Sequence, residues 1–222
     1  MRKSSIAGAV VALTLATAAP AFAGNPPGTA SAGSADFAKS GQTFKVAPLA
    51  VCDVNPDAAG TVSGSSAAVS RTGLAIGETS STCTTEMVDP AKFLTRTTSV
   101  AKGAGFDLSA LAGLSGGLKG PRLKIGEWSI TCTADEKSTS AGWELKAMSG
   151  WTGLPKEIKP GYVHDIVGKN GTVLAKAKFT DTVLPQPNDG SISMTLLKIT
   201  FEPSSGYTGS ITVGTVACSP TP

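Results

Sequence analysis

Histidine is nearly absent from this chain, and its scarcity excludes most catalytic and metal sites that depend on an imidazole. His164 is the one histidine among 222 residues, so every such mechanism would have to use it. It lies in a predicted strand, where the neighbouring Asp165 points to the opposite face. These two side chains therefore cannot form the hydrogen bond that orients a catalytic histidine. We predict no catalytic residue, no metal ligand and no cofactor.

Charged residues are also few, and neither sign gathers into a run. Lys and Arg total 19 and Asp and Glu total 16, and without Arg2 and Lys3 the basic count falls to 17. Nucleic acids and anionic membranes are bound by clustered basic surfaces, which this sequence lacks. We therefore predict no nucleic-acid partner, and no membrane partner once the N-terminal segment is removed.

Long apolar runs are missing except in the first 23 residues. Arg2 and Lys3 precede an apolar segment at 6–19, and Ala21-Phe22-Ala23 offers small residues to a signal peptidase. The apolar segment is shorter than the roughly 20 residues that a membrane span needs, and Pro20 interrupts it. We therefore predict a removable signal peptide at 1–23, and prefer it to a retained membrane anchor.

Cysteine pairs with the C-x-x-C spacing of zinc sites are missing too. The four cysteines are Cys52, Cys83, Cys132 and Cys218, and an even count in an exported chain predicts two disulfides. Three pairings are open. We favour Cys52 with Cys83, which closes a short N-terminal loop, and Cys132 with Cys218, which ties a central strand to the last one.

Extended helical periodicity is absent, and this favours an all-β fold. Residues 24–41 are rich in Gly, Pro, Ala and Ser with few large apolar residues, which predicts a flexible leader. From residue 42 to residue 222, β-branched residues alternate with polar ones in short runs between turn residues, which predicts a single domain. We expect a two-sheet antiparallel β-sandwich, immunoglobulin-like or related, with a β-barrel as the alternative.

The C-terminal half carries the clearest strand pattern. Four segments, at 162–168, 172–179, 191–201 and 208–217, predict a β-meander. Asn170-Gly171 between the first two predicts a two-residue hairpin turn. Upstream, apolar residues move from odd to even positions at Gly126-Glu127, which predicts a β-bulge there.

Two short motifs resemble functional sites but lack the context that those sites need. Gly113-Leu114-Ser115-Gly116-Gly117 matches the serine nucleophile pattern G-x-S-x-G, yet no predicted strand and helix flank it. Residues 53–57 space three oxygen-bearing side chains as a calcium loop does, but Ala58 and Gly64 replace the required Gly and Glu. We expect a loop and a polar turn, with an irregular calcium site as the lesser alternative.

Aromatic residues make up only 5% of the chain, so the few that leave the core pattern attract attention. Trp128 and Trp143 keep phase with core residues, which predicts that both are buried. Trp151 lies in the turn-rich segment 149–153, where it either covers the core or binds a ligand. We take Trp151, Tyr162 and Tyr207 as candidate binding residues, because such rings stack on sugars and anchor protein partners.

Three segments, at 123–134, 193–201 and 209–218, resemble the choice-of-anchor P family of exported, mostly actinobacterial β-rich proteins. The resemblance implies a surface or secreted location and disulfide packing of the late strands, and it supplies no catalytic residues. Members of that family often continue into a sorting motif or a membrane helix, whereas this chain ends at residues 219–222 without either. We therefore expect release into the medium or loose association with the cell wall.

These observations favour a secreted, non-enzymatic protein with a binding or structural role at the bacterial cell exterior. Its expected partner is a cell-wall polysaccharide or another surface protein. One alternative is a secreted hydrolase of polymers that uses paired carboxylates, for which the candidate acids are Asp107, Asp135, Glu136, Asp165 and Asp181. Another is a protease inhibitor that presents residues 83–90 as a disulfide-held loop with Met87 as its anchor.

Overall fold

The computed structural model describes residues 27–55 and 57–219, so the predicted signal peptide at 1–23 lies outside the described residues. The described chain is built almost entirely from β-strands, with three single-turn 3-10 helices. The elements in order are β1 (Gly28–Lys39), β2 (Gln42–Leu49), β3 (Cys52–Asp53), β4 (Gly60–Ser66), β5 (Val69–Arg71), β6 (Leu74–Ile76), β7 (Thr79–Asp89), β8 (Leu94–Leu108), η1 (Leu111–Gly113), η2 (Gly116–Leu118), β9 (Leu123–Ala134), β10 (Thr139–Lys146), β11 (Val163–Val167), β12 (Val173–Val183), β13 (Ile192–Phe201), η3 (Pro203–Ser205) and β14 (Tyr207–Cys218).

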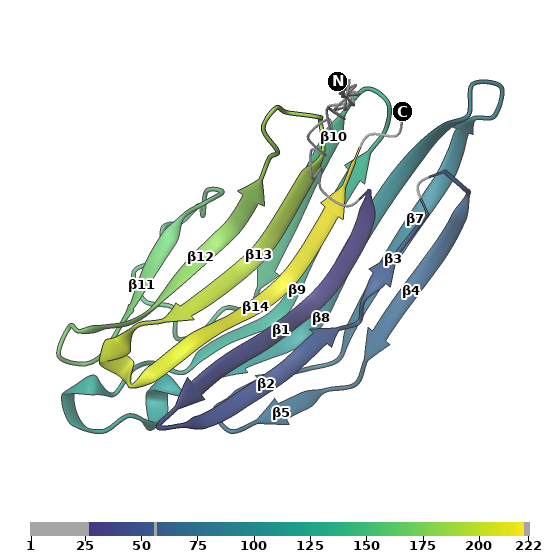
Figure 1. The fold of residues 1–222 in the computed structure, drawn as a ribbon. Helices are drawn as coiled ribbons and strands as arrows, with labels where there is room; N and C mark the ends of the chain where they lie inside the picture. Colours follow the sequence, from purple (N-terminus) through teal and green to yellow (C-terminus); the bar gives the residue numbers. More distant parts are fainter. Residues whose placement is uncertain (1–26, 56, 220–222) are drawn as a thin grey trace, which may run out of the picture.

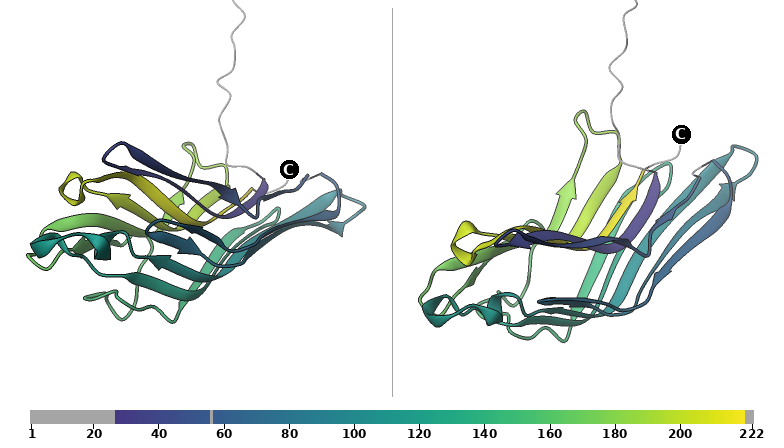
Figure 2. Two further views of the ribbon diagram at one scale, coloured as in Figure 1. Left: turned by 90° about the horizontal axis from the view of Figure 1, so that it is seen from below. Right: turned by 60° about the horizontal axis from the view of Figure 1, so that its bottom comes forward.

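The strands form two antiparallel sheets that pack face to face (Figures 1 and 2). The first sheet has the order β11-β12-β13-β14-β1-β2, with β3 also paired to β1. The second has β10-β9-β8-β6-β5, and in it β7 pairs with both β8 and β4. The prediction of an all-β, two-sheet antiparallel sandwich is confirmed. Within the described residues neither sheet closes into a barrel, so the alternative is excluded.

Two disulfides join the sheets through the core. Cys52 on β3 is bonded to Cys83 on β7, and Cys132 on β9 is bonded to Cys218 on β14. Each bond connects one sheet to the other, and all four side chains are buried. The favoured pairing is confirmed, and the covalent links add to side-chain packing and to a hydrogen bond from Ser99 of β8 to the carbonyl of Ala217 of β14.

The segment expected to be a flexible leader is instead a central strand, so that prediction is wrong over residues 28–39. β1 pairs with β14 along its whole length and with β2 on its other edge. Its small residues are required by close packing, because a Cβ on Gly28 would lie 2.5 Å from Cγ1 of Val54. Ala30 and Ala32 are buried. The sandwich therefore begins at Gly28 and not at residue 42.

The C-terminal meander is confirmed, but its first turn is longer than predicted. The amide of Gly168 donates to the carbonyl of Thr172, and the amide of Gly171 donates to that of Gly168, both at 2.9 Å. This leaves a loop of three residues, 169–171, in which Gly171 takes the left-handed conformation with φ +82°. The side chain of Asn170 accepts a hydrogen bond from the amide of Thr172. A three-residue turn of this kind also needs one left-handed glycine.

The second sheet is creased across its strands. The buried face switches between Ile76 and Thr79, between Ala101 and Phe106 on β8, and between Ile125 and Trp128 on β9. The pairing register is the same on both sides of the switch. The predicted change of face at Gly126-Glu127 is confirmed, but the predicted β-bulge is wrong, since no strand gains a residue.

Glycines make this crease possible. Gly77, Gly105 and Gly126 occupy the same level on neighbouring strands, and we call this level the crease. The amide of Gly77 donates to the carbonyl of Gly105, and a Cβ on Gly77 would lie 1.7 Å from the carbonyl oxygen of Ala104. Gly105 has φ +83°, which favours glycine. Only residues without a side chain allow the backbones to approach this closely.

The first sheet changes face at a matching level, and the two changes pack together. β14 has two successive buried positions at Val213 and Gly214, whereas the crease of the second sheet has two successive outward positions. A Cβ on Gly214 would lie 3.0 Å from Cζ3 of Trp128. Trp128 is therefore held between the two sheets at the bend. Figure 2 shows the bend of the strands themselves.

Candidate functional site

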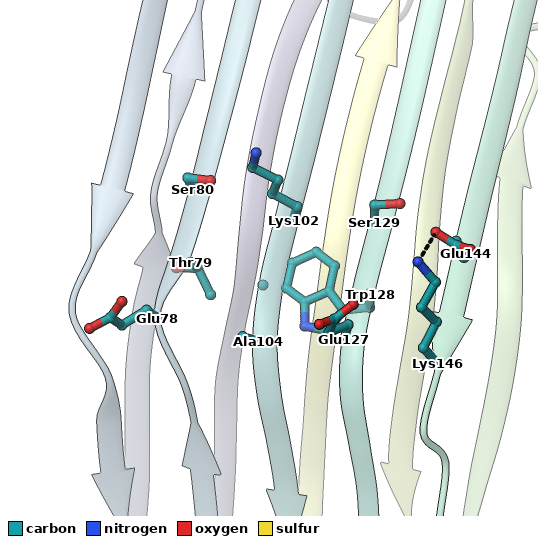
Figure 3. A pocket seen from close by; sticks show the side chains of 11 residues that line it. Glu78, Thr79, Ser80, Lys102, Ala104, Glu127, Trp128, Ser129, Glu144 and Lys146 are labelled. Atoms are coloured by element: carbon teal, nitrogen blue, oxygen red, sulfur yellow. Dashed lines mark ion pairs between the residues drawn. The ribbon is translucent and has the colours of Figure 1, made fainter.

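A hollow of about 490 Å³ lies on the outer face of the second sheet at the crease (Figure 3). We call it the crease hollow. Its floor is the backbone of β7, β8 and β9, and its rim carries charges of both signs. The charged rim residues are Glu78, Glu127 and Glu144 with Lys102 and Lys146. Glu144 and Lys146 form an ion pair at 3.0 Å, and the hydrogen bond to Glu144 raises the pKa of Lys146.

Trp128 lies at the floor of this hollow. The side chain is only 3% exposed, and its ring runs beneath Gly103, where a Cβ would come within 2.6 Å of Cζ2. The prediction that Trp128 is buried is confirmed. Its indole N–H has no hydrogen-bond partner among the described residues, although buried donors are normally satisfied. The indole N–H is thus buried beneath the floor of the crease hollow and does not open into it.

Above the crease, the same outer face carries rows of hydroxyl groups in register. Thr84 and Thr98 are paired, with Thr61 and Thr133 on the strands beyond them and Ser140 on the edge. The Oγ1 atoms of Thr61 and Thr84 are 3.1 Å apart, and those of Thr98 and Thr133 are 3.4 Å apart. A second row, two residues along, contains Ser63, Thr82 and Thr131, with the apolar Val100 of β8 between the two threonines. We call these eight residues the hydroxyl face.

The hydroxyl face is uncharged, and charged residues begin only at its two ends. Glu86 is opposite Arg96 at one end, and Arg96 approaches Asp135 at 3.9 Å. The crease hollow with Lys102 lies at the other end. Each hydroxyl can donate one hydrogen bond and accept others, so the surface matches a neutral partner that is itself rich in hydroxyl groups.

The structure brings together Trp151 and Tyr162, two of the three predicted binding residues, and both of their rings pack against the core. Trp151 donates from Nε1 to the carbonyl of Lys124 at 3.0 Å, and its ring packs edge-on against buried Phe179 at 5.5 Å. Tyr162 stacks on the same phenylalanine at 6.2 Å. Both rings are half-buried against the core. This arrangement favours the interpretation of Trp151 as a lid over that of a ligand platform.

Tyr207, the third candidate binding residue, is remote from this pair. Its ring is buried in the core and is not available to a ligand. It is 8% exposed and packs against Phe37 and Phe201. Its hydroxyl donates to the carbonyl of Ala110 at 3.4 Å. Lys39 caps the ring from outside, with Nζ 4.7 Å from the ring centroid, which is a cation–π geometry.

His164 lies between Trp151 and Tyr162, with ring centroids 6.3 Å from each. Burial lowers the pKa of His164, and the negative charge of Asp165 opposes this change. The neutral imidazole is therefore favoured. The described residues contain no group of three or more His, Cys, Asp or Glu side chains placed to bind a metal ion.

Of the acids considered for hydrolysis, Asp135 and Glu136 line one hollow together with Asp89, and the other three lie elsewhere. Asp107 accepts hydrogen bonds from Arg122 at 2.8 Å and 2.6 Å, which hold its pKa below the ordinary value. Asp135 accepts backbone N–H bonds from Lys137 and Ser138, which also lower its pKa. Each carboxylate is thereby kept ionised and engaged. Glu136 lies in the same loop as Asp135, whereas Asp165 is on β11 and Asp181 is on β12, where it is paired to Lys178 at 2.6 Å.

The other sequence motifs have structural explanations. Residues 113–117 lie across η1 and η2, with no strand-turn-helix arrangement around Ser115. Asn55 accepts a hydrogen bond from the amide of Asp57 at 2.9 Å, which is a polar turn. Residues 83–89 belong to β7 and are paired with β8, so this segment is not a free loop of the kind an inhibitor presents.

Sequence reasoning missed the crease hollow and the hydroxyl face. The charged rim residues come from separate strands and have no linear spacing. One signal was available, because the switch of apolar phase at Gly126-Glu127 recurs at Gly77-Glu78 and near Gly105. Aligning those three switches would have predicted the register of the strands and hence the level of the crease.

Comparisons with protein-family models, with curated proteins and with solved structures found no match for this chain. Among the residues that the structure describes, no helix is both long enough and apolar enough to cross a membrane.

Proposed function

We propose that this protein is secreted and acts at the bacterial cell exterior as a non-enzymatic module that binds neutral wall polysaccharide. The observation that carries the proposal is the hydroxyl face. Of its eight hydroxyl groups, five form a row across five strands and three lie in a second row that Val100 of β8 interrupts, and no charge lies among them. Neighbouring strands are spaced by about 4.8 Å, and alternate residues along a strand by about 7 Å. Such a surface offers many weak donors and acceptors to an extended, hydroxyl-rich chain.

The disulfides support the extracellular part of the proposal. Both are buried and both join the two sheets. Disulfides form and persist in oxidising compartments and are rare in the cytosol. The crease hollow supports the binding part, because it continues the hydroxyl face on the same outer surface.

The two alternatives receive less support from the geometry. A hydrolase needs two carboxylates about the scissile bond with different protonation states, whereas Asp107 and Asp135 are each kept ionised by separate partners. An inhibitor needs an exposed extended loop, whereas Met87 lies in the paired strand β7.

Co-sedimentation with isolated cell walls and insoluble polysaccharides, over a salt series, tests the proposal. We expect saturable binding that survives high salt, because the hydroxyl face is uncharged. Thr98→Glu places a charge at the centre of that face and is expected to weaken binding at least tenfold. Thr212→Glu makes the same change on the outer face of the first sheet and is expected to leave binding unchanged.

Binding that is absent, or that Thr98→Glu and Thr212→Glu weaken equally, would contradict the proposal. Thermal unfolding of both variants checks that any loss is not caused by misfolding. Trp151→Ala provides a further contrast, since the packing of that ring predicts a loss of stability more than a loss of binding.

A further inference from the structure

The connection from β8 to β9, at 109–122, lies at the end of the sandwich opposite the β7–β8 hairpin (Figure 1). Turns at 39–42, 71–74 and 168–172 reach the same end. These four segments contain no acidic residue, and their basic residues are Lys39, Arg71, Lys119, Arg122 and Lys169. The fold therefore gathers at one end positive charges that lie far apart in the sequence.

Two of these cations belong to turns that are hydrogen-bonded to each other. The amide of Lys169 donates to the carbonyl of Lys119 at 3.1 Å, and the amide of Asn170 donates to that of Gly117 at 3.0 Å. A Cβ on Gly168 would lie 3.1 Å from the carbonyl oxygen of Gly117, so the two turns are in close contact. Both lysine side chains are exposed. Because the backbone that presents them is already held in place, binding a ligand would cost little loop entropy.

Arg71 and Lys39 are linked to the same connection by other contacts. The carbonyl of Gly73 accepts a hydrogen bond from the amide of Ala110 at 2.9 Å, which places the turn that carries Arg71 against segment 109–122. Lys39 caps the ring of Tyr207, whose hydroxyl donates to the carbonyl of Ala110. Four cations therefore surround one connection. We call them the basic end, and they are Lys39, Arg71, Lys119 and Lys169.

The cations of the basic end are not neutralised by neighbouring acids. None of the four side chains forms an ion pair with a residue that the structure describes. Arg122 differs, because Asp107 already binds it at 2.6 Å. Glu202, half-buried at the turn after β13, offsets at most one charge. A net positive charge therefore remains exposed at this end.

At the opposite end of the sandwich, the basic side chains near the turns are matched by acids. The ion pairs there are Asp89–Lys92, Asp135–Arg96 and Glu136–Lys137. These pairs lie roughly 45 Å from the basic end, measured along β8 from Leu94 to Leu108. Exposed charges separated by more than about 8 Å are largely screened at physiological salt. The acids of that end therefore cannot neutralise the basic end.

We propose that the basic end binds an anionic polymer whose phosphate or carboxylate groups recur along its chain. Like charges that gather without partners repel one another, and a bound polyanion would replace that repulsion with attraction. A polymer with repeated charges can contact several of these cations at once and release its own counterions, which favours binding. The basic end is a second surface, separate from the hydroxyl face, and its binding does not depend on that face.

The composition of this end favours a polymer over a membrane or a nucleic acid. Leu118, at 36%, is the one large apolar side chain of segment 109–122 that is exposed, which is too little to anchor the protein in a bilayer interface. Binding to nucleic acid bases uses exposed rings for stacking. The four segments contain no aromatic residue, and Tyr207 beneath Lys39 is buried.

Fluorescence anisotropy of end-labelled polyphosphate and polygalacturonate tests the proposal, using exported protein with both disulfides intact. We expect binding of at least one polymer at about 50 mM salt that weakens at least tenfold by about 200 mM, because ion contacts depend on counterion release. Lys119→Gln with Lys169→Gln removes two charges of the basic end and should remove about half of this salt dependence. The matched control, Lys176→Gln with Lys198→Gln, removes two exposed charges from the first sheet and should bind as the unmodified chain does.

Absence of binding to both polymers at the lower salt concentration, or equal losses in the two double variants, would overturn the proposal. Tighter binding to vesicles of anionic phospholipid than to either polymer would overturn it in favour of a membrane. Thermal unfolding of both double variants checks that they are folded. Thr98→Glu should leave this binding unchanged, because Thr98 lies roughly 34 Å along β8 from Leu108. Failure of the hydroxyl face and failure of the basic end are thereby distinguished.

Discussion

Gly77 and Gly142 both lie in the second sheet, but only Gly77 occupies a position where no side chain fits. A Cβ on Gly77 would lie 1.7 Å from a backbone carbonyl oxygen, whereas a Cβ on Gly142 would meet nothing within 4 Å. Backbone cannot move aside as the end of a flexible side chain can, so the strands of the crease would have to separate.

We predict that Gly77→Ala lowers the free energy of unfolding by about 3 kcal/mol, in the upper range of overpacking substitutions. Gly142→Ala is the matched control and should change it by less than about 0.5 kcal/mol. Urea denaturation followed by tryptophan fluorescence measures both. Similar midpoints for the two variants would show that the crease tolerates a side chain.

His164 provides a pH dependence that can be assigned to one residue. Its pKa is lowered by burial, so between this pKa and the unfolded value of about 6.5 the unfolded chain binds more protons. Unfolding therefore becomes easier as the pH falls below about 6.5, and the effect levels off below the folded pKa. The carboxylates with lowered pKa values titrate only at more acidic pH.

We predict that the melting temperature falls between pH 7.5 and pH 5.5, and that His164→Gln reduces this fall. Calorimetry at several pH values measures the difference, and NMR titration of the imidazole should give a pKa below 6.5. An equal pH dependence in both proteins would show that other groups cause it.

Among the elements, β1 differs most from its sequence-based prediction, because a strand replaces the expected flexible leader. Its amides are paired with β14 on one side and with β2 on the other. We predict that hydrogen exchange of residues 28–39 is as slow as that of β14, whereas the edge strand β4 exchanges quickly. Mass spectrometry of peptic fragments measures these rates. Rapid exchange over residues 28–39 would contradict this strand and support the interpretation of the segment as a flexible leader.

The strands with alternating side chains were predictable, and those built from small residues were not. In β12, Ala175, Ala177 and Phe179 alternate with lysines, so the sequence shows which face is buried. In β1, Gly28, Ala30 and Ala32 face the core without large side chains, so composition resembles a linker. How closely the two sheets approach each other is decided by the tertiary structure, and no local sequence pattern indicates it.

The candidate site was less predictable than the fold for a related reason. Trp128 could be placed in the core from its phase alone. The crease hollow, in contrast, depends on charged side chains from β8, β9, β10 and the segment between β6 and β7 meeting at neighbouring levels. Their meeting is decided by pairing registers that hydrophobic alternation does not specify.

At the scale of the whole molecule, the disulfides are the main covalent constraint on the two layers. Their sequence separations are 31 and 86 residues. Closing loops of these lengths stabilises a chain by about 4 to 4.5 kcal/mol each in the chain-entropy model. We predict losses of about this size for Cys52→Ala with Cys83→Ala, and for Cys132→Ala with Cys218→Ala.

Chemical denaturation of each double variant measures these losses. Because all four sulfur-bearing side chains are buried, a thiol reductant should leave the folded protein oxidised and react only when denaturant is added. Ready reduction without denaturant would show that the sheets open more often than this packing allows.

The placement of the crosslinks also decides how the protein would respond to mechanical force. Pro27 and Ser219 lie side by side, joined by a hydrogen bond from the amide of Ser219 to the carbonyl of Pro27 at 3.1 Å. A pull that separates them would peel β1 from β14 one pair at a time. With both disulfides intact, only residues 27–52 and 83–132 could be drawn out, while 53–82 and 133–217 stay behind the bonds. Most of the folded chain would thus be shielded from tension applied at its ends.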